Sequence, residues 1–242
     1  MENLLVEIGN TAVKAAWSEG SVLGKTFRYQ GEKVMGFIST LTDKQIPSVL
    51  AVVSVRNITP EEESVLKCAC QDLIIMDPAH PGLLSAYGIP GFLSYDRAAS
   101  LVAAKYLFKD KACTVCDFGT TLTIDYLGAD GSYKGGNISL GCRTRFKALN
   151  RYSKSLPLVN MPSSDKFPGD SEKSSIESGV ISGIMFEIDG YIRSNPENIV
   201  IFTGGDAIYF AKRMKNSIFV VCNLGLMGLA IITDEYVKKN IQ

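Results

Sequence analysis

The sequence contains one short pattern twice, at positions 110 residues apart. Residues 4–14 read Leu-Leu-Val-Glu-Ile-Gly-Asn-Thr-Ala-Val-Lys, and residues 114–125 read Thr-Val-Cys-Asp-Phe-Gly-Thr-Thr-Leu-Thr-Ile-Asp. In both, an apolar run leads into an acidic residue, a glycine and a threonine, and an alternating run follows. The offset pairs Glu7 with Asp117, Gly9 with Gly119 and Thr11 with Thr121. Because each copy of a repeated motif builds a related structural unit, we expect two similar halves.

Each copy of the pattern predicts a β-hairpin. Alternation of apolar and polar residues is typical of a strand that is buried on one face. The expected strands cover residues 12–17 and 22–29 in the first copy, and residues 122–127 and those from Tyr133 in the second. Asp130 and Gly131 form the Asp-Gly pair that favours a tight hairpin turn. Each half should therefore open with antiparallel strands whose first turn carries acid, glycine and hydroxyl together.

Such a turn suits phosphate binding. A glycine lets the backbone approach a ligand, exposed amides and a threonine hydroxyl donate hydrogen bonds to phosphate oxygens, and a carboxylate holds a cation or its water. Two copies that face each other would hold one polyphosphate from both sides. The alternative is that both are ordinary hairpin turns, in which glycine and threonine are common.

Helices alternate with strands downstream of each hairpin. Apolar runs predict strands, a capping residue followed by proline and acid predicts a helix start, and apolar residues every four positions predict a long helix. The expected strands are 49–55, 73–76 and 198–202, and the expected helices are 59–70, 96–107, 176–192 and 206–214. We therefore expect an α/β fold of two similar domains, residues 1–109 and 110–242, with a cleft between them.

The charge balance excludes one class of partner. The chain carries 25 Lys and Arg against 25 Asp and Glu, without a basic stripe, so the electrostatic attraction on which nucleic-acid binding depends is missing. The longest uncharged run, residues 218–232, is shorter than the roughly 20 residues of a membrane span. Glu2 is acidic where a secretory signal carries positive charge. We expect a cytoplasmic protein that binds neither nucleic acid nor membrane.

Histidine and cysteine usage narrows the chemistry. The single histidine, His80, leaves almost nothing from which to build a His-rich zinc site or a His-paired nucleophile. The Cys-x-x-Cys pair of Cys113 and Cys116 lies in a β-prone run, so buried free thiols are expected rather than a redox site. A near match to a nucleotide P-loop at residues 20–26 leads into a strand and lacks one residue between its glycines. Carboxylates, hydroxyls, backbone amides and bound ions must therefore carry the chemistry.

Five motifs in order give the chain a family resemblance. They are Glu7-Ile8-Gly9-Asn10-Thr11 with Lys14; Tyr87 to Arg97, which ends Tyr95-Asp96-Arg97; Asp117-Phe118-Gly119-Thr120-Thr121-Leu122-Thr123; Gly135-Gly136-Asn137-Ile138 with Gly141; and Thr203-Gly204-Gly205. The acid-x-Gly-x-Thr hairpins resemble the actin, sugar kinase and Hsp70 superfamily of ribonuclease-H-like (actin-like ATPase) domains. The finer pattern resembles the type III pantothenate kinases.

The resemblance implies an activity and a set of site residues. That family phosphorylates the terminal hydroxyl of pantothenate with ATP, giving 4'-phosphopantothenate in the first step of coenzyme A biosynthesis. It acts as a homodimer with Mg²⁺ and a monovalent cation, K⁺ or NH₄⁺. The implied residues are Glu7, Ile8, Gly9, Asn10, Thr11, Ala12, Val13, Lys14 and Thr120 for ATP, Asp117 for K⁺, Tyr87, Ser94, Tyr95, Asp96, Arg97 and Glu172 for pantothenate, and Asp96 as the proton acceptor.

Asp96 has two interpretations. As a base, its carboxylate would orient the substrate hydroxyl and accept its proton late in phosphoryl transfer. Arg97 beside it could keep the carboxylate ionised and meet the carboxylate of the substrate. Alternatively, Asp96 precedes Ala98, Ala99 and Leu101 as a helix N-cap would. One residue could also perform both roles.

Four positions depart from the family pattern. The family has aspartate at position 7, glycine at 94, proline at 140 and threonine at 172, and this chain has Glu7, Ser94, Leu140 and Glu172. Glu7 is longer by one methylene and would shift its carboxylate by roughly 1 to 1.5 Å, a scale of misplacement that can cost about 10²-fold in rate. Glu172 would repel an anionic substrate unless it points away, and Ser171 could substitute for the threonine.

These departures keep other functions open. One alternative is a catalytically weakened or non-catalytic nucleotide-binding homologue, and another is a kinase of a different small alcohol. On the long helix, Gly179 and Gly183 lie four residues apart and would let another helix approach closely. By resemblance this strip lies near a subunit interface that closes the substrate pocket of the partner, and the alternative is a buried contact within the chain.

Overall fold

A computed structural model of the 242-residue chain describes residues 2–80, 84–162 and 166–241. The chain forms two compact units, of which the first comprises residues 1–107 and 223–242 and the second residues 108–222. The predicted domain boundary after residue 109 is close to the point, after Leu107, at which the chain passes from the first unit to the second. The C-terminal segment, however, was expected in the second domain and belongs to the first unit.

The first unit is built on a five-stranded mixed sheet in the order β3-β2-β1-β4-β5. Its strands are β1 (Glu2–Ile8), β2 (Val13–Glu19), β3 (Val22–Tyr29), β4 (Val49–Ser54) and β5 (Asp72–Met76). Strands β1, β4 and β5 are parallel, whereas β2 is antiparallel to both of its neighbours. The parallel strands therefore bring the residues that follow β1, β4 and β5 to one edge of the sheet, where ligands bind in open α/β sheets.

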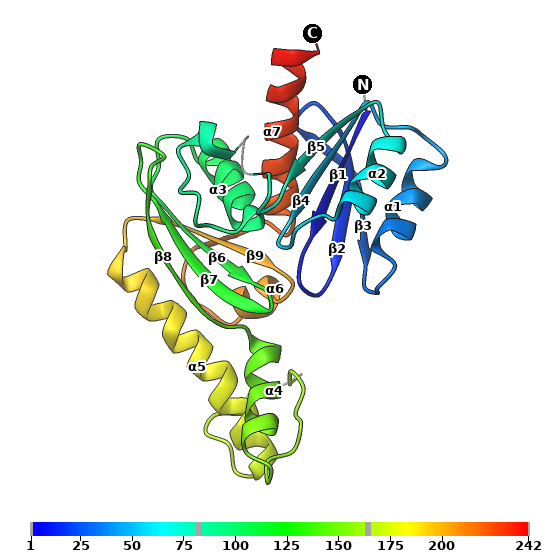
Figure 1. The fold of residues 1–242 in the computed structure, drawn as a ribbon. Coiled ribbons are helices and arrows are strands. Elements are labelled where there is room, and N and C mark those ends of the chain that lie inside the picture. The colour runs from blue at the N-terminus through cyan, green and yellow to red at the C-terminus, as the bar shows by residue number, and fades with distance from the viewer. Residues whose placement is uncertain (1, 81–83, 163–165, 242) are drawn as a thin grey trace. The chain divides into compact units, whose positions relative to one another are not determined.

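Helices cover both faces of this sheet. They are α1 (Val34–Thr42), α2 (Pro60–Cys68), α3 (Tyr95–Leu107) and α7 (Leu224–Asn240), with a short 3₁₀ helix at Leu84–Tyr87. Helices α1 and α2 lie on one side of the sheet and α7 on the other (Figure 1). The predicted start of α2 is confirmed, because Thr59 and Glu62 form a reciprocal capping box ahead of Pro60.

Helix α7 joins the first unit because it packs closely on α3. A Cβ at Gly228 would lie 1.7 Å from the carbonyl oxygen of Ala99, so only a glycine lets the two helices approach this closely. Nearly all of the apolar residues of α7 are buried, which explains why the part of the uncharged run from Leu224 to Ile232 is apolar. Among the helices that the structure describes, none has the length and hydropathy that a membrane span requires.

The second unit repeats the topology of the first. Its strands are β6 (Cys113–Phe118), β7 (Thr121–Leu127), β8 (Tyr133–Leu140), β9 (Ile199–Gly204) and β10 (Ile218–Val220), and its helices are α4 (Cys142–Tyr152), α5 (Glu172–Ser194) and α6 (Ala207–Ala211). The sheet order β8-β7-β6-β9-β10 matches that of the first unit strand for strand. The predicted duplication and α/β class are thus confirmed. The helix expected at 206–214 is shorter, and the one expected at 176–192 is longer.

The core of the second unit lies between its sheet and its helices. The four-residue spacing on α5 has the predicted effect, since Ile176, Val180, Ile184, Ile188 and Ile192 are all buried. They pack with alternate residues of β6 and β7 and with the stacked rings of Phe118 and Phe210. Helices α4 and α5 run side by side (Figure 1).

The two hairpin loops differ in length by one residue. Gly9 N–H donates to the Ala12 carbonyl, whereas Gly119 N–H donates to the Thr121 carbonyl. The expected offset of 110 is therefore correct up to the glycine and wrong after it, because Ala12 and not Thr11 is equivalent to Thr121. Thr120 alone occupies the space that Asn10 and Thr11 fill in the first copy.

The cysteines yield a prediction about thiol reactivity. Cys113, Cys116 and Cys142 are buried, and burial raises the pKa of Cys113 to about 11, that of Cys142 to about 12 and that of Cys116 further. Burial also raises the pKa of Cys70 to about 11. The thiolate is the reactive form, so at pH 8 a pKa of 11 leaves only about 10⁻³ of a thiol reactive.

We expect a colorimetric thiol reagent at pH 8 to label the exposed Cys68 and Cys222 quickly, the half-buried Cys70 slowly, and the buried Cys113, Cys116 and Cys142 only after unfolding. Since a raised pKa lowers the thiolate fraction below that pKa, labelling of Cys70 should accelerate as the pH rises toward 11. Rapid labelling of Cys113 or Cys116 at pH 8 in the folded protein would contradict the burial of these thiols.

Candidate active site

The first loop joins β1 to β2 at the carboxyl edge of the sheet. Gly9 N–H closes the turn on the Ala12 carbonyl at 3.1 Å, and Asn10 and Thr11 are exposed at its tip. Glu7 lies just inside, with only 8% of its surface exposed. It pairs across the strands with Lys14, whose Nζ donates to Glu7 Oε1 at 2.7 Å. The loop thus presents backbone and hydroxyl groups above a partly buried ion pair.

The carboxylate of Glu7 lies against two helices of the same unit. Its Oε2 is 2.5 Å from where a Cβ of Gly225, in the first turn of α7, would stand. The Oγ of Ser100, on α3, is 3.5 Å from that same point. Asp96 precedes Ser100 by four residues on α3, and residues four apart share one face of a helix. Glu7 and Asp96 therefore belong to one neighbourhood within the first unit.

Asp96 lies within the first turn of α3. The helix begins at Tyr95, and the Ser94 carbonyl accepts the N–H of Ala98 at 2.9 Å, so Ser94 occupies the capping position. The alternative that Asp96 is the N-cap is wrong. Asp96 Oδ1 accepts the N–H of Arg97 at 2.9 Å, and the residue is partly exposed. Its carboxylate is therefore anchored through one oxygen and accessible to solvent.

Tyr87 is oriented by a residue that the sequence did not indicate. Its hydroxyl donates to Glu235 Oε2 of α7 at 2.8 Å. Burial and this bond both raise the pKa of Tyr87 well above its ordinary value. Burial also raises the pKa of Tyr95, with a smaller contribution from the nearby carboxylate of Asp77.

Asp77 is a second residue that the sequence did not indicate, and it organises the chain after β5. It is completely buried, and its carboxylate accepts the N–H groups of Ile58, Ala79 and His80 as well as a bond with His80 Nδ1 at 2.8 Å. Burial by itself would raise the pKa of Asp77, but the bonds from Ile58, His80 and Ala79 outweigh it, and the pKa lies below its ordinary value. Asp77 is therefore an ionised anchor.

The second loop is held in place by the start of α4. The Thr120 carbonyl accepts the N–H of Gly141 at 3.1 Å and the hydroxyl of Thr144 at 2.7 Å. A Cβ at Gly141 would lie 2.1 Å from the Gly119 carbonyl oxygen, so the two segments touch backbone to backbone. Gly141 from the fourth motif thus supports the loop of the third, and the side chain of Thr120 remains exposed.

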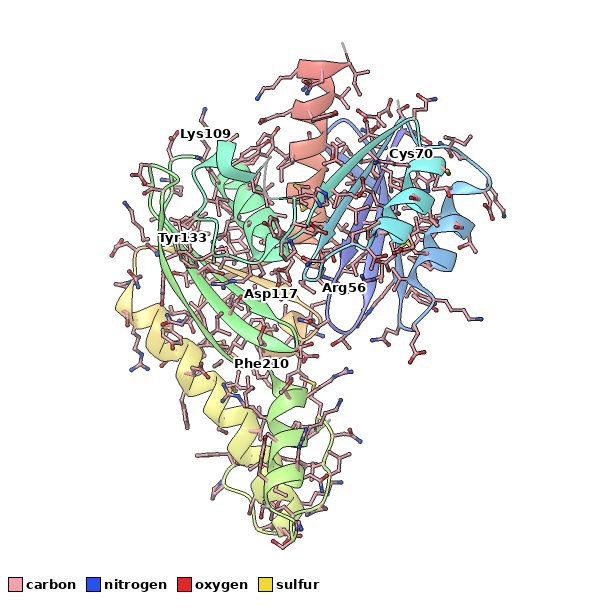
Figure 2. The ribbon with its side chains drawn as sticks, in the orientation of Figure 1. Arg56, Cys70, Lys109, Asp117, Tyr133 and Phe210 are labelled. Atoms are coloured by element: carbon pink, nitrogen blue, oxygen red, sulfur yellow. The ribbon has the colours of Figure 1, made fainter. Side chains whose placement is uncertain are left out.

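Asp117 lies at the end of β6, beside β9 (Figure 2). Gly204 has a positive φ of 92°, and a Cβ there would lie 2.3 Å from Asp117 Oδ1. Thr123 stands directly opposite Asp117 on β7, and its buried hydroxyl has no hydrogen-bond partner among the described residues. An orphaned hydroxyl beside a carboxylate is a donor set that suits a cation with oxygen ligands. In the described part of the chain, no three His, Cys, Asp or Glu side chains gather as a metal site.

Glu172 is the first residue of α5. Ser171 is the N-cap, and its hydroxyl accepts the N–H of Ser174 at 3.2 Å. Glu172 is exposed and lines a largely apolar groove of about 820 Å³ between α4 and α5, together with Leu140, Tyr152, Gly179 and Val180. A Cβ at Gly179 would contact nothing within 4 Å, so the alternative of a buried contact within the chain is not supported there.

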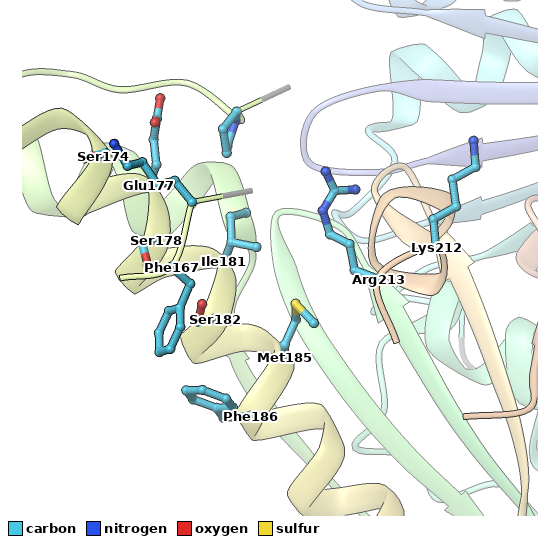
Figure 3. Close-up of a pocket in the computed structure, with 12 residues that line it drawn as sticks. Phe167, Ser174, Glu177, Ser178, Ile181, Ser182, Met185, Phe186, Lys212 and Arg213 are labelled. Carbon is cyan, nitrogen blue, oxygen red and sulfur yellow. The ribbon is translucent and has the colours of Figure 1, made fainter. Parts of the chain in front are cut away.

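A second pocket of about 400 Å³ lies on another face of α5 (Figure 3). Phe167, Met185 and Phe186 form its apolar wall, and Lys212 and Arg213 stand on a separate segment. The guanidinium of Arg213 stacks 3.5 Å from the ring centre of Tyr209. This pocket contains none of the predicted site residues.

The predicted residues fall into two groups. The first unit contains the loop from Glu7 to Lys14, Tyr87 and the segment from Ser94 to Arg97, and the second contains Asp117, Thr120 and Glu172. The supporting residues that sequence reasoning missed are Asp77, Thr144, Gly225 and Glu235. Each acts through contacts between segments far apart in the chain. Of these four residues, only Asp77 had a local signal in the sequence that could have indicated it, because its carboxylate follows directly after a buried strand.

Comparison with known proteins gives a consistent family. The model of the type III pantothenate kinase family matches residues 3–194. A type III pantothenate kinase of Flavobacterium johnsoniae is 36% identical over 236 residues, with 94% of this chain and 95% of that protein covered. One of Phocaeicola vulgatus is 34% identical over 233 residues, with 94% and 96% covered.

Solved structures show the same fold. The activator of the 2-hydroxyisocaproyl-CoA dehydratase from Clostridium difficile, solved with bound ADPNP, aligns with a TM-score of 0.61 at 13% identity and covers 100% of this chain and 97% of that one. A ROK hexokinase from Thermus thermophilus aligns with a TM-score of 0.54 at 10% identity and covers 96% and 98%. The expected fold of two actin-like ATPase domains is thereby confirmed.

Proposed function

The chain belongs to the type III pantothenate kinase family, and we propose that it transfers the γ-phosphoryl group of ATP to pantothenate with Asp96 as the proton acceptor. Membership makes it an ATP-dependent phosphotransferase that acts on an alcohol in coenzyme A biosynthesis. The observation that carries the role of Asp96 is its position in the first turn of α3, one turn before Ser100, whose hydroxyl lies near the same point of α7 as the carboxylate of Glu7.

The proposed chemistry needs little from Asp96 beyond position. An alcohol attacks the phosphoryl group through a loose transition state, so the base chiefly orients the hydroxyl and accepts its proton late. Asp96 Oδ1 is held by the N–H of Arg97, which leaves Oδ2 for the substrate hydroxyl. We assign Tyr87, Ser94, Tyr95 and Arg97 to pantothenate, with Arg97 facing its carboxylate.

We assign the phosphates of ATP to the two loops. Residues Glu7 to Lys14 supply backbone amides and the hydroxyl of Thr11 in one unit, and Thr120 supplies a hydroxyl in the other. Bound Mg²⁺ would neutralise charge on the phosphate oxygens. The carboxylate of Asp117 and the hydroxyl of Thr123 suit K⁺ or NH₄⁺. We also retain the cytoplasmic location expected from the sequence.

ADP release by the purified protein tests this function. With ATP, Mg²⁺ and K⁺, we expect turnover that depends on pantothenate and is absent without it. Turnover with a different small alcohol alone would indicate a kinase of another substrate. Nucleotide binding without turnover on pantothenate or any of a panel of small alcohols would indicate a non-catalytic homologue, the outcome that Glu7 and Glu172 leave open.

We also propose a homodimer in which the groove between α4 and α5 faces a second copy of the chain. The groove is apolar, and Tyr152 at its rim is 83% exposed. Glu172 lines the same groove. A second copy bound in the groove would therefore lie next to the carboxylate of Glu172, which would no longer face the solvent. Large exposed apolar areas commonly mark protein interfaces.

A substitution in the groove should separate the two copies. Gly179 is exposed with open space at its Cβ position, so Gly179→Arg leaves the monomer unstrained but obstructs the groove. We expect sedimentation equilibrium to give two chains for the wild type and one for Gly179→Arg. Gly190→Arg, also exposed on α5 but outside the groove, is the control and should remain dimeric. A dimeric Gly179→Arg variant would reject this interface.

A further inference from the structure

The two acidic residues of the repeat share an unexpected feature. Each carboxylate lies close to a glycine that is distant in sequence, at the point where any other residue would have its Cβ. A Cβ at Gly204 would lie 2.3 Å from Asp117 Oδ1, and a Cβ at Gly225 would lie 2.5 Å from Glu7 Oε2. In both units, therefore, a glycine from another segment leaves the space that the acidic side chain occupies.

The reasons for glycine differ between the two positions. Gly204 has a positive φ, which by itself favours glycine. Gly225 is the second residue of α7 and has no such conformation, and a glycine within a helix is less favourable than alanine. The backbone conformation of α7 therefore does not require glycine at position 225. The requirement comes instead from the carboxylate of Glu7, which occupies the space of a Cβ at this position.

The extra length of Glu7 explains why the space is needed. Glu7 is one methylene longer than Asp117, its counterpart in the repeat, and its Oε1 is held by Lys14 at 2.7 Å. Its second oxygen must then point toward α7, where the first turn carries partial positive charge that favours an anion. Leu224 and Leu226 on either side of Gly225 are fully buried, so α7 has little room to shift.

From this geometry we propose that Gly225 is a positioning residue for Glu7. The glycine reserves the space into which the longer acidic side chain extends, so that Glu7 and Gly225 form a matched pair beneath the first phosphate loop. The proposal rests on the assignment of that loop to ATP in the proposed function. A methyl group at 225 should displace the carboxylate of Glu7, whereas the shorter side chain of Glu7→Asp should avoid it.

A double-mutant cycle tests the pair. We expect Gly225→Ala to lower kcat/KM for ATP by about 10²-fold, because small displacements in a reacting site have effects of this size. Adding Glu7→Asp should recover about tenfold or more of that loss, since contacting residues are energetically coupled. Gly190→Ala, on an exposed helix position with open space, is the matched control and should retain wild-type activity.

Two further measurements on the wild type, both single variants and the double variant do not depend on turnover. They are the affinity for a non-hydrolysable ATP analogue and the melting temperature. Recovery by Glu7→Asp in activity, affinity or folding supports the pair, including the case in which Gly225→Ala alone does not fold. Purely additive effects in all three readouts would overturn the proposal. A wild type that binds the analogue but does not phosphorylate pantothenate would count against the proposed function alone, because the cycle in affinity can still be completed.

Discussion

Asp96→Asn is expected to lower kcat for pantothenate phosphorylation by about 10²–10⁴-fold, the usual contribution of a positioned general base. Asparagine keeps the shape of the side chain and an oxygen that can accept the N–H of Arg97, so the start of α3 should persist. It cannot accept the proton of the substrate hydroxyl. KM for ATP should therefore change little, because the nucleotide loops are untouched. Steady-state ADP release with varied ATP and pantothenate measures both quantities.

The control for this variant is Asp43→Asn, which changes an exposed carboxylate at the end of α1. It should show wild-type kinetics. If Asp96→Asn kept more than about a tenth of the wild-type kcat, general-base catalysis by Asp96 would be excluded. A matched loss of kcat and melting temperature would instead indicate a structural role, so thermal unfolding of both variants accompanies the assay.

Gly141→Ala is the second substitution with a large expected effect. Gly141 has φ −67° and ψ 165°, a conformation that any residue adopts, so the requirement for glycine is steric. The new Cβ would lie 2.1 Å from the Gly119 carbonyl oxygen and 2.8 Å from that of Thr120. Both obstacles are backbone atoms and cannot rotate away. The second phosphate loop must therefore move, and we expect kcat/KM for ATP to fall by at least about 10²-fold.

A graded variant distinguishes loop displacement from general damage. Thr144→Val removes only the hydroxyl that donates to the Thr120 carbonyl at 2.7 Å. Loss of one such hydrogen bond changes an equilibrium constant by about 3- to 10-fold. We therefore expect Thr144→Val to weaken the affinity for a nucleotide analogue by that factor. Gly190→Ala again serves as the control for the glycine substitution. Unchanged affinity in a folded Gly141→Ala variant would show that this loop does not bind the nucleotide.

Much of the fold was predictable because its signals are local. Alternating residues, an Asp-Gly turn and a capping box around Thr59 depend on neighbours within a few positions, and all of these elements are confirmed. The repeat itself predicted two units of the same topology. The predicted roles of Asp96, Thr120 and Asp117 in the reaction remain predictions, although the loops that carry them have the expected form.

Other features depended on contacts between distant segments. The position of α7 in the first unit follows from its close packing against Ala99, which no local pattern indicates. The single-residue difference between the loops followed from strand register. The cap interpretation of Asp96 failed because α3 begins at Tyr95, so Asp96 lies inside the first turn of the helix.

The sequence by itself determined the family, the duplicated topology and the residue types available for phosphoryl transfer, because these follow from order and spacing along the chain. Only the tertiary structure decided how the acidic side chains are accommodated. Gly225 and Gly204 lie far from Glu7 and Asp117 in sequence, and their importance arises from an absent Cβ at a point of contact. Steric fit between distant segments is a property of the packed molecule, which a one-dimensional pattern does not contain.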